Sequence, residues 1–415
     1  GNQWRIEKRK KSTGALCTAA ECGTEFGSGG VVLSNPSSGS DQAYGIAIDS
    51  NYIYVVGWDS VEGDNQLRIE KRKKSTGALC TAAECGTEFG SGGVVQRNPT
   101  GGEDLFYTVA VDDDYLYVAG KDNNNGGQWV IEKRNKTTGA LCTSTDACAA
   151  GAFDGDGIIT QYWNSAGSES AHSIAIDSSY LYIAGWDYAG GDLGWRVQKR
   201  NKSDGSLVSA FGSNGEVTSD PTTDDDSLYS IKVDSDYIYL GGYENVDPAG
   251  DYQWRIEKRN KTTGALCTST DACAAGEFGS GGVVNVDPSS GVNSDDYVRA
   301  VTVDSGYIYI TGMDVVPGNR QWRIEKRNID TGAYATSATS ATNGNEDTAL
   351  TNLAKNTTIR LRIEISNEGT ATSEDVQYRL EYGKKTGASC SDISTWVDVG
   401  AEGGDWDMSD SAYLT

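Results

Sequence analysis

A repeat of about 60 residues, returning along most of the chain, constrains the fold more than any other feature. The segment QWRIEKRKKSTGALCTAAECGTEFGSGGVV at 3–32 returns at 66–95 with one change, Trp4 becoming Leu67. Looser copies begin at Trp129, Trp195, Trp254 and Trp322, so successive copies are 63, 62, 66, 59 and 68 residues apart. This period is too long for one solenoid coil and matches one four-stranded propeller blade. We therefore expect an all-β fold, a β-propeller.

Four strands are predicted within one repeat. They cover YGIAID (44–49), YIYVVG (52–57), LRIEKRKK (67–74) and FGSGGVV (89–95). The second strand is apolar on both faces, as expected of a strand between neighbouring blades. If the fourth strand joins the next three, five blades result, and residues 3–11 remain as an extra N-terminal strand. The intact blade number stays open.

Composition and charge exclude several classes of protein. The chain of 415 residues has 52 Gly and 22 Tyr but only 2 Met and 1 His, which favours short strands and turns. A formal charge of −24 argues against a nucleic-acid partner, which requires a positive field. No apolar run approaches the roughly 18 residues of a membrane helix. Without a signal peptide at its start, the chain is expected to be an interior piece of a longer protein.

The expected domains are a propeller at 1–333, a Ser/Thr/Ala-rich linker at 334–350 and an incomplete β-sandwich at 351–415. The repeat copies lie near 3–65, 66–128, 129–194, 195–253 and 254–333. In the last region IRLRIEI and VQYRLEY alternate strictly between apolar and polar residues, which is typical of half-buried strands.

Eight of the nine cysteines form close pairs, each between the third and fourth strands of a repeat. The pairs are Cys17 with Cys22, Cys80 with Cys85, Cys142 with Cys148, and Cys267 with Cys273. The copy near Trp195 crosses this region without the insertion, so each pair is expected to close an inserted loop as a disulfide. A zinc site would need further ligands nearby. Disulfides imply an oxidising, extracellular compartment. Cys390 is expected to pair beyond residue 415.

Few residues suggest chemistry. His172 is the single histidine, and it takes the place held by Tyr44, Tyr107, Tyr229 and Arg299 in the other repeats, which favours a packing or hydrogen-bonding role. No nucleophile motif or phosphate loop is present, so no catalytic residue and no cofactor are expected. In FDGDG, Asp154 and Asp156 are a weak candidate for Ca²⁺ beside a plain turn.

Acids and aromatic residues are expected on one face. An acid stands eight residues before the aspartate that ends each first strand, giving Asp41, Asp104, Glu169, Asp226 and Asp296. These acids either cap turns or form a ring that binds a cation or ligand. Large aromatic residues share the face, namely Trp58, Trp163, Trp186 and Tyr243. They either pack between blades or stack on sugars. The third-strand lysines are expected on the opposite face.

The motif W-x-I-x-K-R-N, followed by F-G-x-x-G-x-V and a D-x-[YI]-x-[YVIL]-x-G strand, resembles the delta-60 repeat of bacterial secreted and cell-surface propellers. The copy WRVQKRNKSDGSLVSAFGSNGEV at 195–217 is the most similar, and the resemblance covers about residues 1–333. It implies a propeller in an extracellular setting and carries no shared catalytic residues. The last 65 residues resemble an immunoglobulin-like, CARDB-like sandwich.

Two functions are expected from these patterns. The first is a non-enzymatic structural or adhesive segment of a large extracellular surface or filament protein, with copies of itself or other surface proteins as partners. The alternative is a carbohydrate- or ligand-binding propeller that uses the acidic, tryptophan-bearing face, with glycans as partners. On either interpretation we expect no enzyme, no nucleic-acid partner and no membrane span in this segment.

Overall fold

The repeats fold into successive β-sheets in the computed structural model. It describes residues 2–61, 63–145, 148, 152–163, 167–188, 191–247, 251–270, 273, 276–287, 296–316, 319–335, 381–382 and 397–398. The chain divides into two compact units, 1–10 with 15–339, and 11–14 with 340–415. The first unit contains the repeats.

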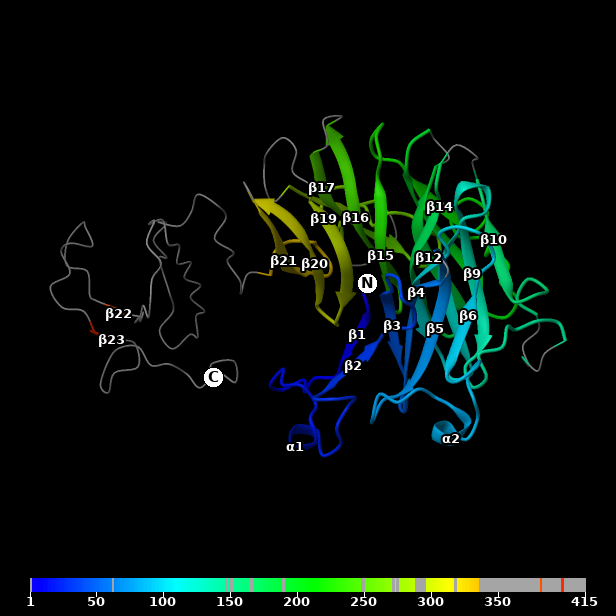
Figure 1. The fold of residues 1–415 in the computed structure, drawn as a ribbon. Helices are drawn as coiled ribbons and strands as arrows, with labels where there is room; N and C mark the ends of the chain where they lie inside the picture. The colour runs from blue at the N-terminus through cyan, green and yellow to red at the C-terminus, as the bar shows by residue number, and fades with distance from the viewer. Residues whose placement is uncertain are drawn as a thin grey trace. The chain divides into compact units, whose positions relative to one another are not determined.

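Four sheets of this unit have four antiparallel strands each, in chain order across the sheet (Figure 1). One is β3 (Gln42–Ile48), β4 (Tyr52–Val61), β5 (Asp64–Lys73) and β6 (Val94–Arg97). The next is β7 (Leu105–Val111), β8 (Tyr115–Asp122), β9 (Gln128–Asn135) and β10 (Ile158–Gln161). Then follow β11 (Ser170–Ile176), β12 (Tyr180–Asp187), β13 (Gly194–Asn201) and β14 (Glu216–Ser219). The last is β15 (Ser227–Val233), β16 (Tyr237–Asp247), β17 (Asp251–Asn260) and β18 (Val283–Val286).

Smaller elements flank these sheets. A three-stranded sheet follows, of β19 (Tyr297–Val303), β20 (Tyr307–Val316) and β21 (Asn319–Asn328). A two-stranded sheet precedes them, of β1 (Trp4–Glu7) and β2 (Val31–Ser34). Short helices are α1 (Ala19–Cys22), α2 (Ala82–Cys85) and the 3-10 turn η1 (Asn124–Gly126). Helices α1 and α2 both lie at the lower edge of Figure 1.

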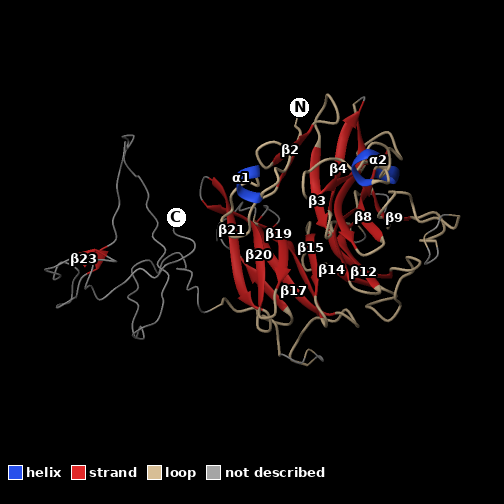
Figure 2. Ribbon diagram, turned by 90° about the horizontal axis from the view of Figure 1, so that it is seen from below, coloured by secondary structure: helices blue, strands red, loops and turns tan. Residues whose placement is uncertain are grey.

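The first strand of each sheet is the inner strand. Strand β3 lies beside β7, β7 beside β11, β11 beside β15, and β15 beside β19, the last pair being visible in Figure 2. Sheets that meet through their first strands and pack face to face are the arrangement of propeller blades. The expected fold class, an all-β propeller, is confirmed.

The fourth strand does not join the next repeat as expected. Each fourth strand pairs with the third strand of its own repeat, as Val94–Arg97 does with Leu67–Glu70. The segment between the third and fourth strands is fastened to the third strand, and the copy near Trp195, which lacks the insertion, makes the same bonds through Lys199. Lys71 donates its N–H to Gly93 O, and Cys80 donates its N–H to Lys71 O. These bonds direct the fourth strand back alongside the third strand of the same repeat. Residues 4–7 likewise pair with β2 rather than remaining single.

The hydrophobic core lies between neighbouring sheets. One cluster joins Tyr54 and Leu67 of one sheet to Phe106 and Val118 of the next. The tryptophan that begins a third strand is buried there and donates its indole N–H across to a carbonyl of the next sheet. These bonds are Trp4 to Trp58 O, Trp129 to Trp186 O, Trp195 to Tyr243 O, and Trp254 to Met313 O.

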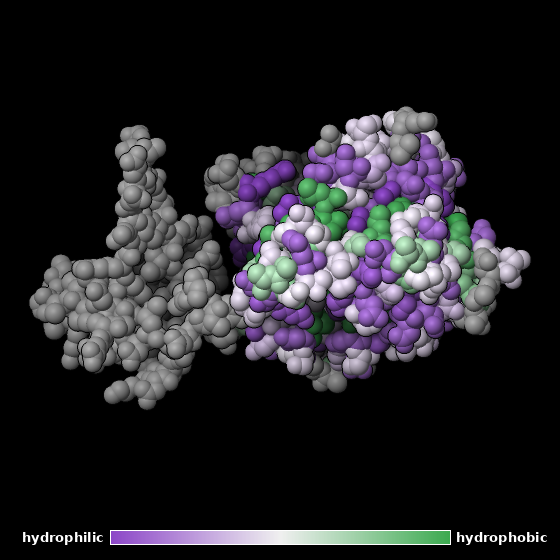
Figure 3. Space-filling view, turned by 60° about the horizontal axis from the view of Figure 1, so that its bottom comes forward, coloured by the Kyte–Doolittle hydropathy of each residue, from purple (hydrophilic) through white to green (hydrophobic). Residues whose placement is uncertain are grey.

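The last sheet differs, because Trp322 of β21 is 95% exposed where Trp254 is fully buried. Ile324, on the same strand, is also exposed, at 74%. Large hydrophobic residues are also exposed at Leu33 of β2 and at Ile46 and Ile48 of β3. The face seen in Figure 3 is mostly hydrophilic, with hydrophobic residues between the hydrophilic ones.

The four predicted disulfides are confirmed. Each joins residues five or six positions apart in the loop before the fourth strand. Among the described residues, no helix has the length and apolar character needed to cross a membrane. Disulfides are consistent with an extracellular protein.

The predicted linker and sandwich fall almost entirely outside the described residues. Within them, β22 (Glu381–Tyr382) pairs with β23 (Val397–Asp398). The resemblance to an immunoglobulin-like domain stays a prediction, as does the pairing of Cys390.

Candidate functional site

Each inner strand carries a β-bulge at the same repeat position. The ladder between the first and second strands skips one residue in all five sheets that have a first strand. The extra residues are Tyr44, Tyr107, His172, Tyr229 and Arg299. A bulge bends its strand and changes the direction of a side chain, which is why bulges are frequent beside binding sites.

The bulge residues contact one another from one inner strand to the next. The ring centroids of Tyr44 and Tyr107 are 5.0 Å apart, and those of Tyr107 and His172 are 4.1 Å apart and stacked. His172 meets the ring of Tyr229 edge-on at 5.3 Å. The guanidinium of Arg299 lies 4.5 Å from the Tyr229 centroid. We call these five residues the aromatic arc.

Two residues from second strands extend the arc. Trp186 stacks on the other side of His172, with centroids 3.9 Å apart, and touches Tyr229 at 5.4 Å. Tyr243 lies 6.0 Å from Tyr229 and 5.0 Å from Tyr297. The imidazole is therefore enclosed by aromatic rings on three sides.

The arc is electrically neutral at physiological pH except at Arg299. Burial among the rings lowers the pKa of His172 well below its usual value, and the positive charges of Arg299 and Lys121 lower it further. Burial raises the pKa of the phenols of Tyr107 and Tyr229. Uncharged hydroxyl and imidazole groups can exchange hydrogen bonds with a polar, uncharged ligand.

One polar atom of the arc lacks a partner among the described residues. Nε2 of His172 is buried without a hydrogen bond. Buried polar atoms in native proteins are nearly always paired, and each exception needs an explanation such as an ion, water or ligand. Other members remain accessible, since Tyr44 is 47% exposed and Arg299 is also exposed.

The five acids predicted as a ring are buried at the start of the inner strands. Asp226 shows the common geometry, because its carboxylate accepts hydrogen bonds from the backbone N–H groups of Thr222 and Asn245. Equivalent bonds are made by Asp41 to Ser37 and Ser60, by Asp104 to Thr100 and Asn123, by Glu169 to Trp163, and by Asp296 to Val315. These carboxylates join the loop before the first hairpin to the loop after it. The acids therefore cap turns, the first of the two roles expected from the sequence, the second being a ring that binds a cation or ligand.

This geometry has an electrostatic cost. Burial raises the pKa of Asp226 to about 6, despite the hydrogen bonds that favour its charged form. Burial also raises the pKa of Asp104. Because these carboxyl groups lie within the protein, a cation or ligand would reach them only if the loops moved.

The predicted sugar-stacking residues divide into two pairs. Trp58 is almost fully buried, and Trp163 packs edge-on against Trp129 and beneath the guanidinium of Arg196. Tyr243 is as buried as Trp58, but both Tyr243 and Trp186 contact the aromatic arc. The structure thus brings two of the four predicted residues to one site.

The candidate calcium residues form an ordinary turn. Asp154 has a positive φ of 51° and donates its N–H to Asp204 O, while Asp156 accepts the N–H of Ile158. In the described part of the chain, no three His, Cys, Asp or Glu side chains gather as a metal site requires.

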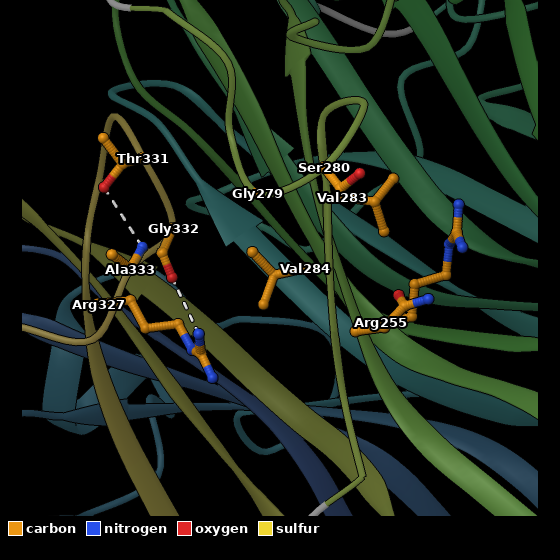
Figure 4. Close-up of a pocket in the computed structure, with 10 residues that line it drawn as sticks. Arg255, Gly279, Ser280, Val283, Val284, Arg327, Thr331, Gly332 and Ala333 are labelled. Atoms are coloured by element: carbon orange, nitrogen blue, oxygen red, sulfur yellow. Dashed lines mark hydrogen bonds between the residues drawn. The ribbon is translucent and has the colours of Figure 1, made fainter.

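Two cavities lie away from the arc. One of about 600 Å³ is formed between β18 and the end of β21 (Figure 4). Its two arginines are already paired, Arg255 with Glu244 and Glu257, and Arg327 with Glu325 and Gly332 O. Another, of about 690 Å³, lies among the first-hairpin turns near Asp112 and Asp177.

The sequence indicates part of the arc. Aligning the repeats at the aspartate that ends the first strand places Tyr, Tyr, His, Tyr and Arg in one column, for which a packing or hydrogen-bonding role of His172 is expected. The bulge that brings the five side chains into contact is not revealed by repeat spacing.

Known proteins resemble this chain in fold alone. No protein-family model and no curated protein matches the sequence. Among solved structures, the phage phi92 endosialidase has a TM-score of 0.40 and 9% identity, covering 90% of this chain and 78% of that one. A thermostable family-43 glycoside hydrolase has a TM-score of 0.33 and 12% identity, covering 70% and 91%. The Cellvibrio cellulosa alpha-L-arabinanase complexed with arabinohexaose has 0.32 and 13%, covering 68% and 90%.

These neighbours correct two expectations. The expected non-enzymatic structural or adhesive segment is contradicted, because the solved structures similar to the chain are named as glycoside hydrolases and an endosialidase. The expectation that the chain is no enzyme is contradicted on the same ground. At this low identity, the function of this chain has to be argued from its own residues.

Proposed function

We propose that the propeller binds carbohydrate along the aromatic arc. The observation that carries this proposal is the bulge repeated in five inner strands, which places an aromatic or planar cationic side chain at every bulge position. Ring faces cover the apolar faces of sugars, while phenol and imidazole groups exchange hydrogen bonds with sugar hydroxyls.

The unpaired Nε2 of His172 supports the same proposal. It is buried between Tyr107 and Trp186 and has no hydrogen-bond partner among the described residues. A sugar hydroxyl would satisfy this atom once the neighbouring rings move to admit it. Exposure of Tyr44 and Arg299 leaves part of the arc open to a ligand.

The site suits an extracellular glycan. The disulfides are consistent with a secreted protein, and we propose a position at the cell surface, as the repeat resemblance implied. Glycans of a surface or of the surroundings would then be the partners.

Titration calorimetry against oligosaccharides tests the proposal. We expect binding of at least one member of a panel containing maltohexaose, cellohexaose, arabinohexaose and hexagalacturonate. His172→Ala removes the imidazole, so we expect the affinity to fall about tenfold or more. Tyr107→Phe removes only a hydroxyl, so we expect a smaller loss of affinity. Lys232→Gln, an exposed change on β15, is the control and should bind as the wild type does.

Thermal unfolding of each variant separates loss of the site from loss of the fold. Binding that is unchanged in a folded His172→Ala protein would place the glycan elsewhere. Absence of binding to the whole panel would contradict the proposed function.

A further inference from the structure

We propose that the glycan bound by the aromatic arc is an acidic one, whose carboxylate pairs with the guanidinium of Arg299. This inference rests on the proposed function and adds the class of ligand. Among the five bulge residues, only Arg299 carries a charge at neutral pH.

Arg299 is held in place by aromatic rings. Its guanidinium lies 4.5 Å from the Tyr229 centroid and 5.1 Å from the Tyr297 centroid. The guanidinium also hydrogen-bonds the side chain of Tyr229, so part of its N–H edge is engaged. A guanidinium has five N–H donors, and those not bonded to Tyr229 can donate to a ligand.

Within the described residues, the charge of Arg299 is not balanced by an ion pair of the kind that other arginines make. Arg255 contacts both Glu244 and Glu257. Lys121 of the second strand β8 likewise pairs with Glu103, at 3.0 Å. Arg299 instead contacts the side chains of tyrosines. Arg299 is thus an exposed cation on a chain whose net charge is −24.

A carboxylate matches this group in shape and charge. The planar fork of a guanidinium donates two parallel hydrogen bonds to one carboxylate, and these charge-assisted bonds are stronger than neutral ones. The neighbouring rings of Tyr229 and Trp186 can cover the sugar ring that carries the carboxylate, and they lie 5.4 Å apart, edge to face. The net negative charge disfavours anions at long range, so the selectivity depends on this local contact.

Hexagalacturonic acid and its fully methyl-esterified form provide a matched pair of probes. They differ in charge and share the same backbone. We expect the wild type to bind the acid about tenfold or more tightly than the ester. The preference should decrease as NaCl rises from about 0.05 M to about 0.5 M, because salt screens the exposed pair.

Substitution of Arg299 tests the residue directly. Arg299→Gln should abolish the preference while leaving the binding of the ester unchanged, and Arg299→Lys should restore only part of it, because lysine keeps the charge without the fork. Lys232→Gln is the matched control, since it removes an exposed charge from the adjacent inner strand and should leave the preference intact.

The outcomes separate this inference from the proposed function. Equal binding of acid and ester, or binding of neutral hexasaccharides alone, would overturn the acidic ligand and leave carbohydrate binding standing. A preference that persists in Arg299→Gln would overturn the role of Arg299. Failure to bind any saccharide would contradict both.

Discussion

The two ends of the inner strands differ in how strictly the repeats agree. At the end where the first hairpin turns, each repeat has the same aspartate, tyrosine and lysine contacts. We call this the lysine end. At the other end, which we call the aromatic end, the repeats place Tyr, Tyr, His, Tyr and Arg at one position. The buried acids and the tryptophan indole bonds recur there as well.

At the lysine end, the same hydrogen bonds recur within each first hairpin and between neighbouring sheets. Asp234 accepts the N–H groups of Asp236 and Tyr237, and Tyr239 donates its hydroxyl to the same carboxylate. Lys258 lies 4.1 Å from the Tyr237 centroid and donates to Ile329 O of the following sheet. The equivalent inter-sheet bonds run from Lys71 to Lys136 O, from Lys133 to Lys202 O, and from Lys199 to Lys261 O.

The difference shows which residues stabilise and which are available for recognition. Contacts that recur from sheet to sheet are required wherever two blades meet. The bulge residues vary in chemistry although the bulge recurs, so the backbone there is fixed by folding while the side chain is free to serve a ligand. We therefore assign stability to the lysine end and binding to the aromatic end.

Removing one tyrosine from each end should give the largest contrast. Tyr239→Ala deletes a fully buried ring and its hydrogen bond, so we expect unfolding to become easier by about 3–5 kcal/mol. Tyr229→Ala deletes a partly exposed ring, so we expect about 1–2 kcal/mol. Urea unfolding followed by fluorescence measures both. Equal losses would remove the distinction between the ends.

Removing one lysine tests the inter-sheet bond more narrowly. Lys258→Met keeps the apolar stem but leaves Ile329 O without its donor, so we expect a loss of about 1–3 kcal/mol in unfolding free energy. Lys232→Met, at an exposed position near the same end, should change it by less than about 0.5 kcal/mol. If the two variants unfolded alike, the lysines would be surface residues rather than fasteners.

The single histidine makes the aromatic end sensitive to pH. Because the folded pKa of His172 is lowered, the unfolded chain binds a proton near pH 6.5 that the folded chain does not. Stability due to this group is present above the unfolded pKa and is lost as the pH falls. Between about pH 7.5 and about pH 5.5 the loss is at most about 1.4 kcal/mol, the limit for an imidazole that stays neutral in the folded protein.

Asp226 acts in the opposite direction over part of this range. Its folded pKa is raised to about 6, so the folded state holds its proton more tightly and gains stability as the pH falls. Comparing the wild type with His172→Phe isolates the histidine, since Asp226 is common to both. Identical pH dependence in the two proteins would show that His172 is not held neutral.

Much of the fold could be predicted from the sequence, and less of the site. The repeat indicated the strands and hairpins, and the insertion absent near Trp195 indicated the disulfides. The predicted partner of the fourth strand was wrong, because the pairing depends on how the segment after the third strand bonds to Lys71 and its equivalents, whether or not that segment carries the insertion. The spacing of the repeats located the five acids. It did not reveal that they are buried and bonded to backbone N–H groups, because those groups come from loops of variable sequence.

Carbene footprinting with and without a saturating oligosaccharide from the binding panel tests the central claim most directly. With labelling read residue by residue, we expect a reduction at the aromatic end, at Tyr107, His172, Tyr229 and Arg299. Labelling at the lysine end, at Asp177 and Asp234, should not change. Protection of the lysine end, or of the cavity between β18 and β21 with the aromatic arc still fully labelled, would contradict the assignment of binding to the aromatic end.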